Sequence, residues 1–137
     1  MTQVERSRME ELAGRVEAAS GPDRELDADI ALAAGIVRER DGLIFFGHRD
    51  HSVMVLERGY YDHEGSAPEL PHFTSSLDAA MQLVLEGSYW SCGRDREGAF
   101  AWVSRGETRA IVKFYSAATP ALALLAACLK ARALGEG

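Results

Sequence analysis

The stretch TPALALLAACLKARA, residues 119–133, decides the fold because it predicts a helix that is buried on more than one side. Thr119 and Pro120 are preferred residues for a helix cap and for the first helical position. Residues 121–129 are apolar nearly all round, which is typical of an internal helix. The alternation of alanine and leucine allows a sheet or another helix to approach closely. The remaining segments must therefore supply the layers that cover it.

Three other segments have helical signatures. Residues 4–19 carry apolar side chains at helical spacing and end at a Ser-Gly-Pro break. We expect a second helix over residues 22–34, with Pro22 as its first residue. A third begins where Ser75 and Asp78 match the spacing of a capping box, and it ends at Gly87. With the central helix, the sequence predicts four helices.

Runs rich in β-branched and aromatic residues predict the strands. Residues 43–46 and 52–56 form a hairpin across the polar turn between them. Three more strands are expected after the third helix, at residues 88–92, 99–104 and 108–116. Because the connections have hairpin length, these strands should pair antiparallel. The prediction is an α+β fold with a mainly antiparallel sheet of about four to five strands.

The acidic segment GPDRELDADIALAAG, residues 21–35, raises the question of a metal or catalytic cluster. Asp23, Glu25 and Asp27 fall in the first turns of the second helix, where exposed N–H groups favour negative charge. A metal site would need these carboxylates to converge on one face, and Asp29 points elsewhere. We therefore interpret the acids as residues that stabilise a helix end.

The composition is that of one globular domain covering residues 1–137. The chain is 47% hydrophobic and 26% charged, with a net charge of −6, and this acidity argues against general nucleic-acid binding. Cys92 and Cys128 stand far apart and form no disulfide framework, and Cys128 is expected to be a small core residue. The charged N-terminus and the short apolar runs predict no signal peptide and no membrane association. We expect a cytoplasmic protein.

Two polar turns hold the candidates for a metal site, which are His48, Asp50, His51 and His63. Imidazole and carboxylate groups bind zinc or iron if the two turns meet. The H-x-x-H spacing lacks a second pair at a diagnostic distance, and His and Asp are also ordinary turn residues. The favoured interpretation is therefore two polar loops, with no cofactor and no metal.

Aromatic residues outside the helices are candidates for an interface, and the alternative is that they pack onto their own domain. The candidates are Tyr60, Tyr61, Phe73 and Trp90. Two adjacent tyrosines in a loop are typical of a contact with another chain, because exposed Tyr and Trp often anchor interfaces. Alternate residues of a strand face opposite sides, so Tyr89 and Trp90 cannot both be internal.

Three segments together resemble the phage ABA-sandwich family of small phage and prophage proteins. They are GPDRELDADIA (21–31), LPHFTSSLDAAMQLVLEGSYW (70–90) and ATPALALLAACLKARA (118–133), and AFAWV (99–103) stands where the family carries a strand. Residues 36–69 match nothing in the family and form a variable hairpin and loop region. The resemblance implies a layered α-β-α sandwich and an origin that places the chain in the host bacterial cytoplasm. It implies no activity and no catalytic residues.

Three functions remain open from the sequence. The first is a non-enzymatic interaction or oligomerisation module, which binds itself or another protein. The second is a small-ligand or nucleotide-binding module, in which arginines near hairpin ends bind an anion; they are Arg94, Arg96, Arg105 and Arg109. The third is a metal-dependent hydrolase that uses the histidine turns. We rank them in this order and predict no catalytic residue, because the chain has no nucleophile elbow and no phosphate-loop ending.

Overall fold

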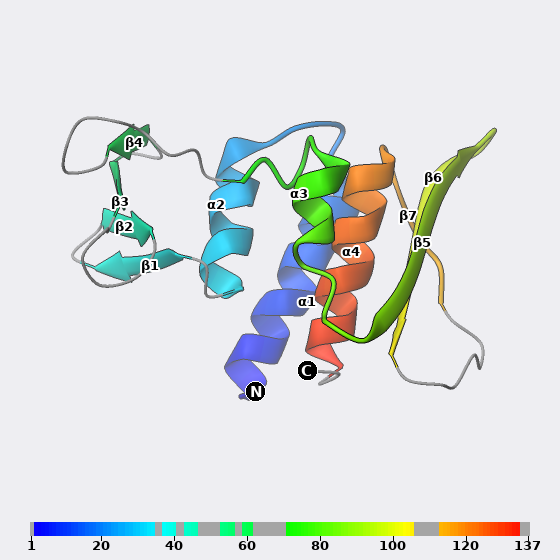
Figure 1. Ribbon diagram of the computed structural model, residues 1–137, viewed down its shortest axis with the longest axis horizontal. Coiled ribbons are helices and arrows are strands. Elements are labelled where there is room, and N and C mark those ends of the chain that lie inside the picture. Colours follow the sequence, from blue (N-terminus) through cyan, green and yellow to red (C-terminus); the bar gives the residue numbers. More distant parts are fainter. Residues whose placement is uncertain are drawn as a thin grey trace.

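The computed structural model describes residues 2–34, 37–40, 43–46, 53–56, 59–61, 71–105 and 113–134 (Figure 1). These ranges form an α+β structure. Their four helices are α1 (Gln3–Ala18), α2 (Arg24–Ala33), α3 (Leu77–Met81) and α4 (Pro120–Ala133). One sheet contains β1 (Val37–Arg40), β2 (Leu43–Phe46), β3 (Val53–Leu56) and β4 (Gly59–Tyr61), whose backbone alone is described. The other contains β5 (Ser88–Asp95), β6 (Gly98–Arg105) and β7 (Tyr115–Ala117).

Helix α4 is the centre of the described structure. Its residues from Ala121 to Leu129 are each at most 6% exposed, which confirms the prediction of a helix buried on several sides. Thr119 caps it by accepting a hydrogen bond from the Leu122 N–H at 3.2 Å, and Pro120 stands at its start as predicted. Helices α1 and α3 pack on α4, and β5, β6 and β7 cover another side (Figure 1). The sequence therefore located the element that organises the core.

The sheet β5–β6–β7 presents one face to α4. Ala99 and Ala101 of β6 are 2% and 0% exposed, because small side chains let the helix lie directly on the middle strand. The β5–β6 pairing runs from Ser88 opposite Arg105 to Asp95 opposite Gly98. The turn is shorter than the predicted loop 93–98, because the Asp95 carboxylate accepts a hydrogen bond from the Glu97 N–H at 2.8 Å. Gly98 has φ 131°, which favours glycine at this position.

The strands β1 to β4 form a separate antiparallel meander. The predicted pairing of β2 with β3 is confirmed, with Phe46 opposite Val53. Two further strands, β1 and β4, were not predicted, because three of the four residues of β1 are charged and β4 has only three residues in a segment rich in turn-forming residues. Among the described elements, this sheet contacts the rest of the chain only where β1 meets α2. The structure thus has two sheets of three and four strands, and it does not confirm one sheet of four to five strands.

Two helices begin or end differently from the prediction. Helix α2 begins at Arg24 rather than at the predicted Pro22, and the Asp23 carboxylate caps it by accepting from the Leu26 N–H at 3.1 Å. Helix α3 is capped by Ser76 instead of Ser75. It ends at Met81, well before Gly87, and the next turn continues with i to i+3 hydrogen bonds.

The early end of α3 has a tertiary cause. The carbonyl oxygen of Leu83 accepts a hydrogen bond from Nη2 of Arg132 on α4 at 3.2 Å. A continuing helix would have used this carbonyl for its own ladder. The contact also connects the segment that leads into β5 to the last turn of α4, so it positions the start of the three-stranded sheet.

Candidate interaction surface

The face of β5–β6–β7 that points away from α4 is aromatic. Tyr89 of β5 and Phe114, which directly precedes β7, are 57% and 56% exposed. Phe100 and Trp102 of β6 lie on the same face and are partly buried, because strand neighbours alternate between the two sides. No described helix or strand lies over this face. We call these four side chains, Tyr89, Phe100, Trp102 and Phe114, the aromatic face.

Local packing holds the aromatic face in place. The rings of Phe100 and Phe114 meet edge to face, with centroids 5.9 Å apart and an interplanar angle of 69°. Gly93 lies opposite Phe100 in the sheet, and a Cβ atom on it would come within 2.9 Å of the Phe100 ring. Glycine at position 93 therefore allows the ring to lie flat across the strand. A side chain there would push Phe100 out of its contact with Phe114.

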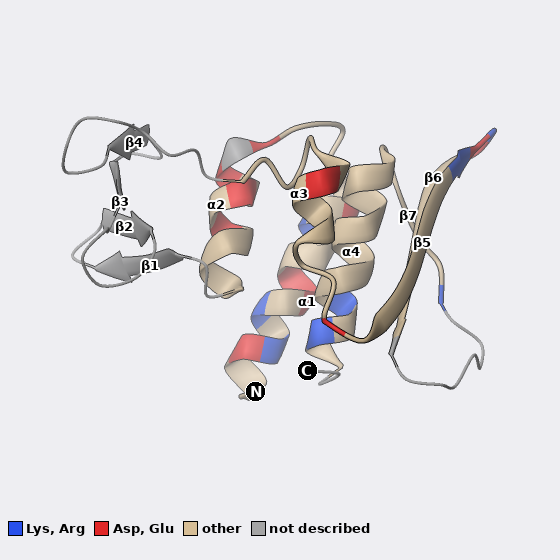
Figure 2. Cartoon of the chain, in the orientation of Figure 1, with Lys and Arg blue, Asp and Glu red and all other residues tan. Residues whose placement is uncertain are grey.

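The sheet is uncharged except near its ends. Lysine, arginine, aspartate and glutamate are absent from β5 and β6 between Ser88 and Gly93 and between Gly98 and Ser104 (Figure 2). The charges of this hairpin gather at its tip, where Arg94, Asp95, Arg96 and Glu97 are all exposed. Removing an uncharged aromatic surface from water is favourable at roughly 25 cal/mol per Å². This face is chemically suited to contact another apolar surface.

The predicted interface residues have different positions. Phe73 is 0% exposed and fills the core between the helices, so a partner cannot reach its ring in this fold. Trp90 lies on the side of β5 that faces α4 and packs partly against the core. Tyr60 and Tyr61 belong to strand β4 rather than to a loop, and their side chains lie outside the described part of the chain.

The interface candidate on β5, Trp90, thus faces α4, and its neighbour Tyr89 faces outward. Alternation showed that Tyr89 and Trp90 face opposite sides, but it does not say which side the core occupies. The residues that indicate the core side are Ala99 and Ala101. Small residues at alternate positions of β6 mark the face on which a helix rests, and the pairing of Ala101 with Cys92 puts Trp90 on the same face. Tyr89, Phe100 and Trp102 are then outward by alternation.

The metal candidates His48, Asp50, His51 and His63 lie outside the described residues, so the structure does not test them. Within the described ranges, no three histidine, cysteine, aspartate or glutamate side chains lie close enough together to hold a metal ion.

The arginines proposed to bind an anion do not converge. Arg94 and Arg96 are exposed at the tip of the β5–β6 hairpin, whereas Arg105 ends β6 opposite Ser88, at the base. Eight residues of strand separate the two ends, which is a distance of about 23 Å at 3.3 Å per residue. Arg109 lies outside the described residues. No single phosphate group can contact both the tip and the base.

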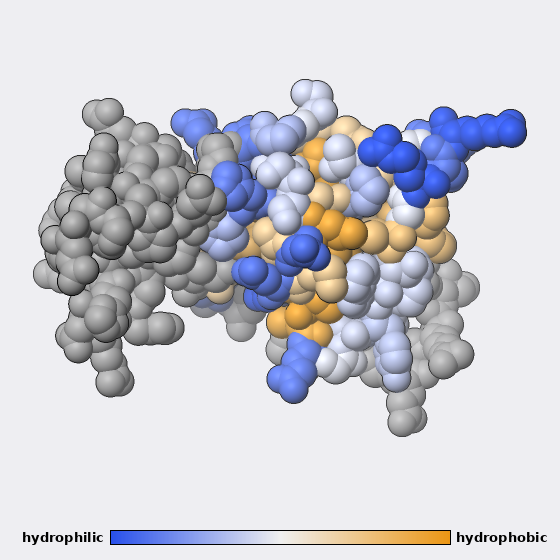
Figure 3. Space-filling model, turned by 45° about the horizontal axis from the view of Figure 1, so that its top comes forward, coloured by the Kyte–Doolittle hydropathy of each residue, from blue (hydrophilic) through white to orange (hydrophobic). Residues whose placement is uncertain are grey.

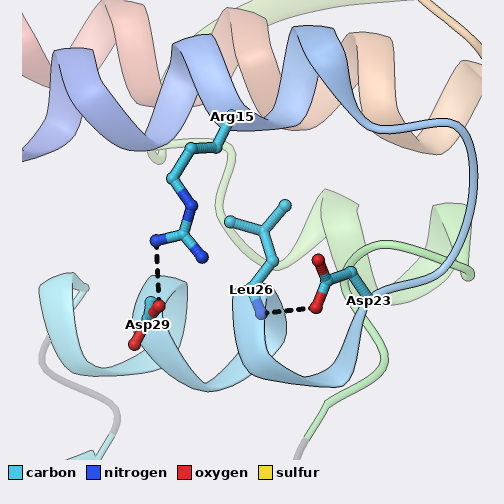
Figure 4. Close-up of polar contacts among 4 residues, drawn as sticks. All are labelled: Arg15, Asp23, Leu26 and Asp29. Atoms are coloured by element: carbon cyan, nitrogen blue, oxygen red, sulfur yellow. Dashed lines mark hydrogen bonds and ion pairs between the residues drawn. The ribbon is translucent and has the colours of Figure 1, made fainter.

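The acidic segment performs three structural functions, two of which Figure 4 shows. Asp23 caps α2, which confirms the helix-end interpretation for this residue. Asp29 forms an ion pair with Arg15 of α1 at 2.9 Å and so connects α2 to α1. Asp27 lies in the first turn of α2, as predicted, and it has a tertiary role as well. It is 0% exposed, and its carboxylate accepts a hydrogen bond from the Thr74 N–H at 2.8 Å, which ties α2 to the segment before α3.

A groove of about 590 Å³ runs along the first half of α1, beside α2. Its lining includes Val4, Arg8, Glu11 and the Arg15–Asp29 pair. Most of the α1 residues that line it are exposed to solvent. Ligand sites usually remove most of the ligand surface from water, and this open groove does not.

Cys128 is an internal thiol on α4. It is 1% exposed and forms no disulfide, as expected for a core cysteine. Burial raises the pKa of the Cys128 thiol to about 12 from its usual 9.0, and nearby Arg132 only partly offsets this increase. The thiol is therefore protonated and shielded at neutral pH, so it does not act as a nucleophile.

The pKa of Cys128 predicts a loss of stability at high pH. In the unfolded chain the thiol ionises above pH 9, whereas in the folded chain it stays protonated up to about pH 12. The contribution that the protonated Cys128 thiol makes to the free energy of unfolding below pH 9 should therefore be lost as the pH rises, by about 2 kcal/mol at pH 10.5. Urea-induced unfolding at a series of pH values from 8 to 10.5 measures this decline in the free energy of unfolding. The variant Cys128→Ala should show a shallower decline, and identical slopes would contradict this assignment.

Within the described ranges, no helix is both long enough and apolar enough to cross a membrane. Comparison with known proteins adds no relative: no protein-family model, no curated protein and no solved structure matches this chain.

Proposed function

We propose that the chain is a non-enzymatic protein-interaction module and that the aromatic face is the surface it offers to a partner. The observation that carries the proposal is the exposure of Tyr89 and Phe114, at 57% and 56%, on an uncharged sheet face that no described element covers. Aromatic side chains of this kind supply much of the binding energy at protein interfaces. The partner is a protein chain with an apolar contact surface.

Rigidity supports this assignment. The edge-to-face contact of Phe100 with Phe114 and the packing of Phe100 over Gly93 limit the motion of the rings before a partner arrives. A surface that is already ordered loses less conformational entropy on binding. The charged hairpin tip next to it provides the polar margin that interfaces usually have around an apolar centre.

The resemblance to the phage ABA-sandwich family extends the proposal. It assigns the chain to small phage or prophage proteins that act in the bacterial cytoplasm as one domain with α-β-α layers. In the described residues, α1 and α4 lie on one side of β5–β6–β7. An α-β-α sandwich has a layer on each face of its sheet. We propose that the partner takes the place of the second layer, over the aromatic face.

Replacing both exposed rings tests the proposal. The double variant Tyr89→Ser, Phe114→Ser should weaken association with the partner by at least about 30-fold, the value for two interface anchors of about 2 kcal/mol together. Association is measured by quantitative capture from bacterial lysate with the wild-type chain and the variant as paired baits. Circular dichroism of the purified variant verifies that it is folded.

The matched control is Val4→Ser, which removes a side chain that is 77% exposed on α1, away from the sheet. It should retain every partner of the wild-type chain. A protein bound by the wild type and by Val4→Ser, but not by the double variant, supports the proposal. If the double variant binds all of the same proteins with unchanged affinity, or if no protein binds specifically, the aromatic face is not an interaction surface.

A further inference from the structure

The outer edge of β5 is an unpaired strand edge in the described part of the chain. β5 is eight residues long and is hydrogen-bonded to β6 along one side only. The Ser88 N–H donates to the Leu85 carbonyl at 3.0 Å, but residues 89–95 make no backbone hydrogen bond to a described residue outside β6. An edge of this length presents a row of free N–H and C=O groups that can pair with another strand.

The first six residues of this edge lack the devices that usually prevent such pairing, although Arg94 near its end is a charge on the inner face. Natural edge strands are often protected by proline, lysine, a bulge or an inward-pointing charge. The first six residues of β5, SYWSCG, contain no proline and no charge, and they pair with β6 in continuous register. Charged residues begin only at Arg94. Most of the edge is therefore open to a second strand.

The inner face beside the same edge is incompletely covered. On β6 the inward residues Ala99 and Ala101 are buried, but Trp90 and Cys92 on β5 remain partly exposed. Leu85, whose carbonyl oxygen accepts the Ser88 N–H at the start of β5, is also partly exposed. Figure 3 shows hydrophobic surface in the middle of the described part, extending toward the sheet. An added strand alone would pair with the free N–H and C=O groups of the β5 edge. It would leave the partly exposed apolar side chains beside this edge, which we call the apolar margin, in contact with water.

We infer that β5 pairs with β5 of a second copy, antiparallel and around a two-fold axis, to form a continuous six-stranded sheet. A second copy supplies both a strand edge and an identical apolar margin, which a single extended peptide does not. Self-pairing around a two-fold axis is isologous, so each feature meets its own copy. This contact uses the edge of β5 and goes beyond the proposed function, which uses the aromatic face.

Symmetry and charge restrict the register, and the pairing of apolar residues on the inner face favours one choice. A two-fold axis perpendicular to the sheet keeps the two inner faces on one side, so one residue must lie opposite itself. An axis at Arg94 would place like charges together. An axis at Ser91 pairs Trp90 with Cys92 of the second copy on both sides, so apolar residues meet on the inner face. We therefore place the axis at Ser91, whose side chain is partly exposed on the outer face.

Opposite charges at position 91 test this arrangement. The wild-type chain should be dimeric in sedimentation equilibrium. Ser91→Lys and Ser91→Asp should each raise the dimer dissociation constant at least about 10-fold, because each places like charges across the axis. An equimolar mixture of the two variants should recover a one-to-one heterodimer, which native mass spectrometry detects by its mass. Recovery in the mixture excludes misfolding as the cause of dissociation.

The control is Ser116→Lys, which adds the same charge to an exposed position on β7, at the opposite side of the sheet. It should leave the dimer intact. A monomeric wild-type chain overturns the inference, and so does a dimer that neither Ser91 variant weakens. Ser91 and Ser116 both lie on the outer face, so if Ser116→Lys weakens the dimer as much as the Ser91 variants do, or more, the copies associate through the outer face and not through the edge. A negative result for edge pairing therefore does not decide the aromatic-face proposal, which the variant Tyr89→Ser, Phe114→Ser tests separately.

Discussion

Replacing Leu125 with alanine is expected to lower the free energy of unfolding by about 3–5 kcal/mol, the largest effect of any single truncation proposed for this chain. Leu125 lies in the middle of α4 and is 0% exposed. The helix is enclosed by α1, α3 and the sheet, so its neighbours cannot collapse into the space that the side chain leaves. The loss therefore contains both the transfer of the removed atoms and the cavity.

Urea-induced unfolding of the purified variant measures this effect through the midpoint of the transition. The matched control is Leu134→Ala, at the end of the same helix, where the side chain is 71% exposed. It should change the free energy of unfolding by less than about 0.5 kcal/mol. Equal losses for the two variants would show that α4 is not enclosed as the structure describes.

Replacing Asp27 with alanine is expected to destabilise the chain by about 2–3 kcal/mol. Asp27 is 0% exposed and accepts the Thr74 N–H at 2.8 Å. Truncation leaves this backbone donor buried without an acceptor, in a place where Thr74 itself is only 1% exposed. A buried donor without a partner loses its hydration and gains nothing in return. The contact joins segments 47 residues apart, so its loss also loosens α2 from the segment that precedes α3.

The same helix provides the control. Asp29→Ala removes the ion pair with Arg15, whose two side chains are 19% and 39% exposed, and it should cost less than about 1 kcal/mol. Asp27→Asn keeps an oxygen acceptor for Thr74 and should lose less stability than Asp27→Ala. Thermal unfolding compares the three variants. If Asp27→Ala is no less stable than Asp29→Ala, the buried hydrogen bond does not hold α2 in place.

The aspartates show where sequence reasoning succeeds and where it stops. Asp23 could be predicted as a helix-terminal residue because its cap depends on the next three residues alone. Asp27 could not be distinguished from it, because its role depends on Thr74, 47 residues away in the sequence. Both residues are acidic and both lie at the N-terminal end of α2, so charge and position in the helix do not distinguish them. Only the packing of α2 against the segment before α3 separates them.

The sequence indicated candidates for an interface but not the face on which each one lies. Alternation in β5 separated Tyr89 from Trp90, and the candidate chosen there, Trp90, faces the helix. Assigning the two faces requires knowing that α4 lies on the side of Ala99 and Ala101. Phe114 gives no sequence signal of its own, because its exposure and its contact with Phe100 arise from the pairing of β7 with β6.

The sequence by itself determined the structural features that depend only on residues close together in the chain. Thr119 and Pro120 start α4, its run of alanine and leucine makes the helix internal, and short turns make the strands antiparallel. Caps, periodicity and turn length act over a few residues, so they can be inferred without a fold. The tertiary structure alone decided that α3 ends at Met81, that Asp27 is buried and that Tyr89 faces outward. Each of these depends on which distant surface α4 or α2 meets, and that choice is made by the packing of the whole core.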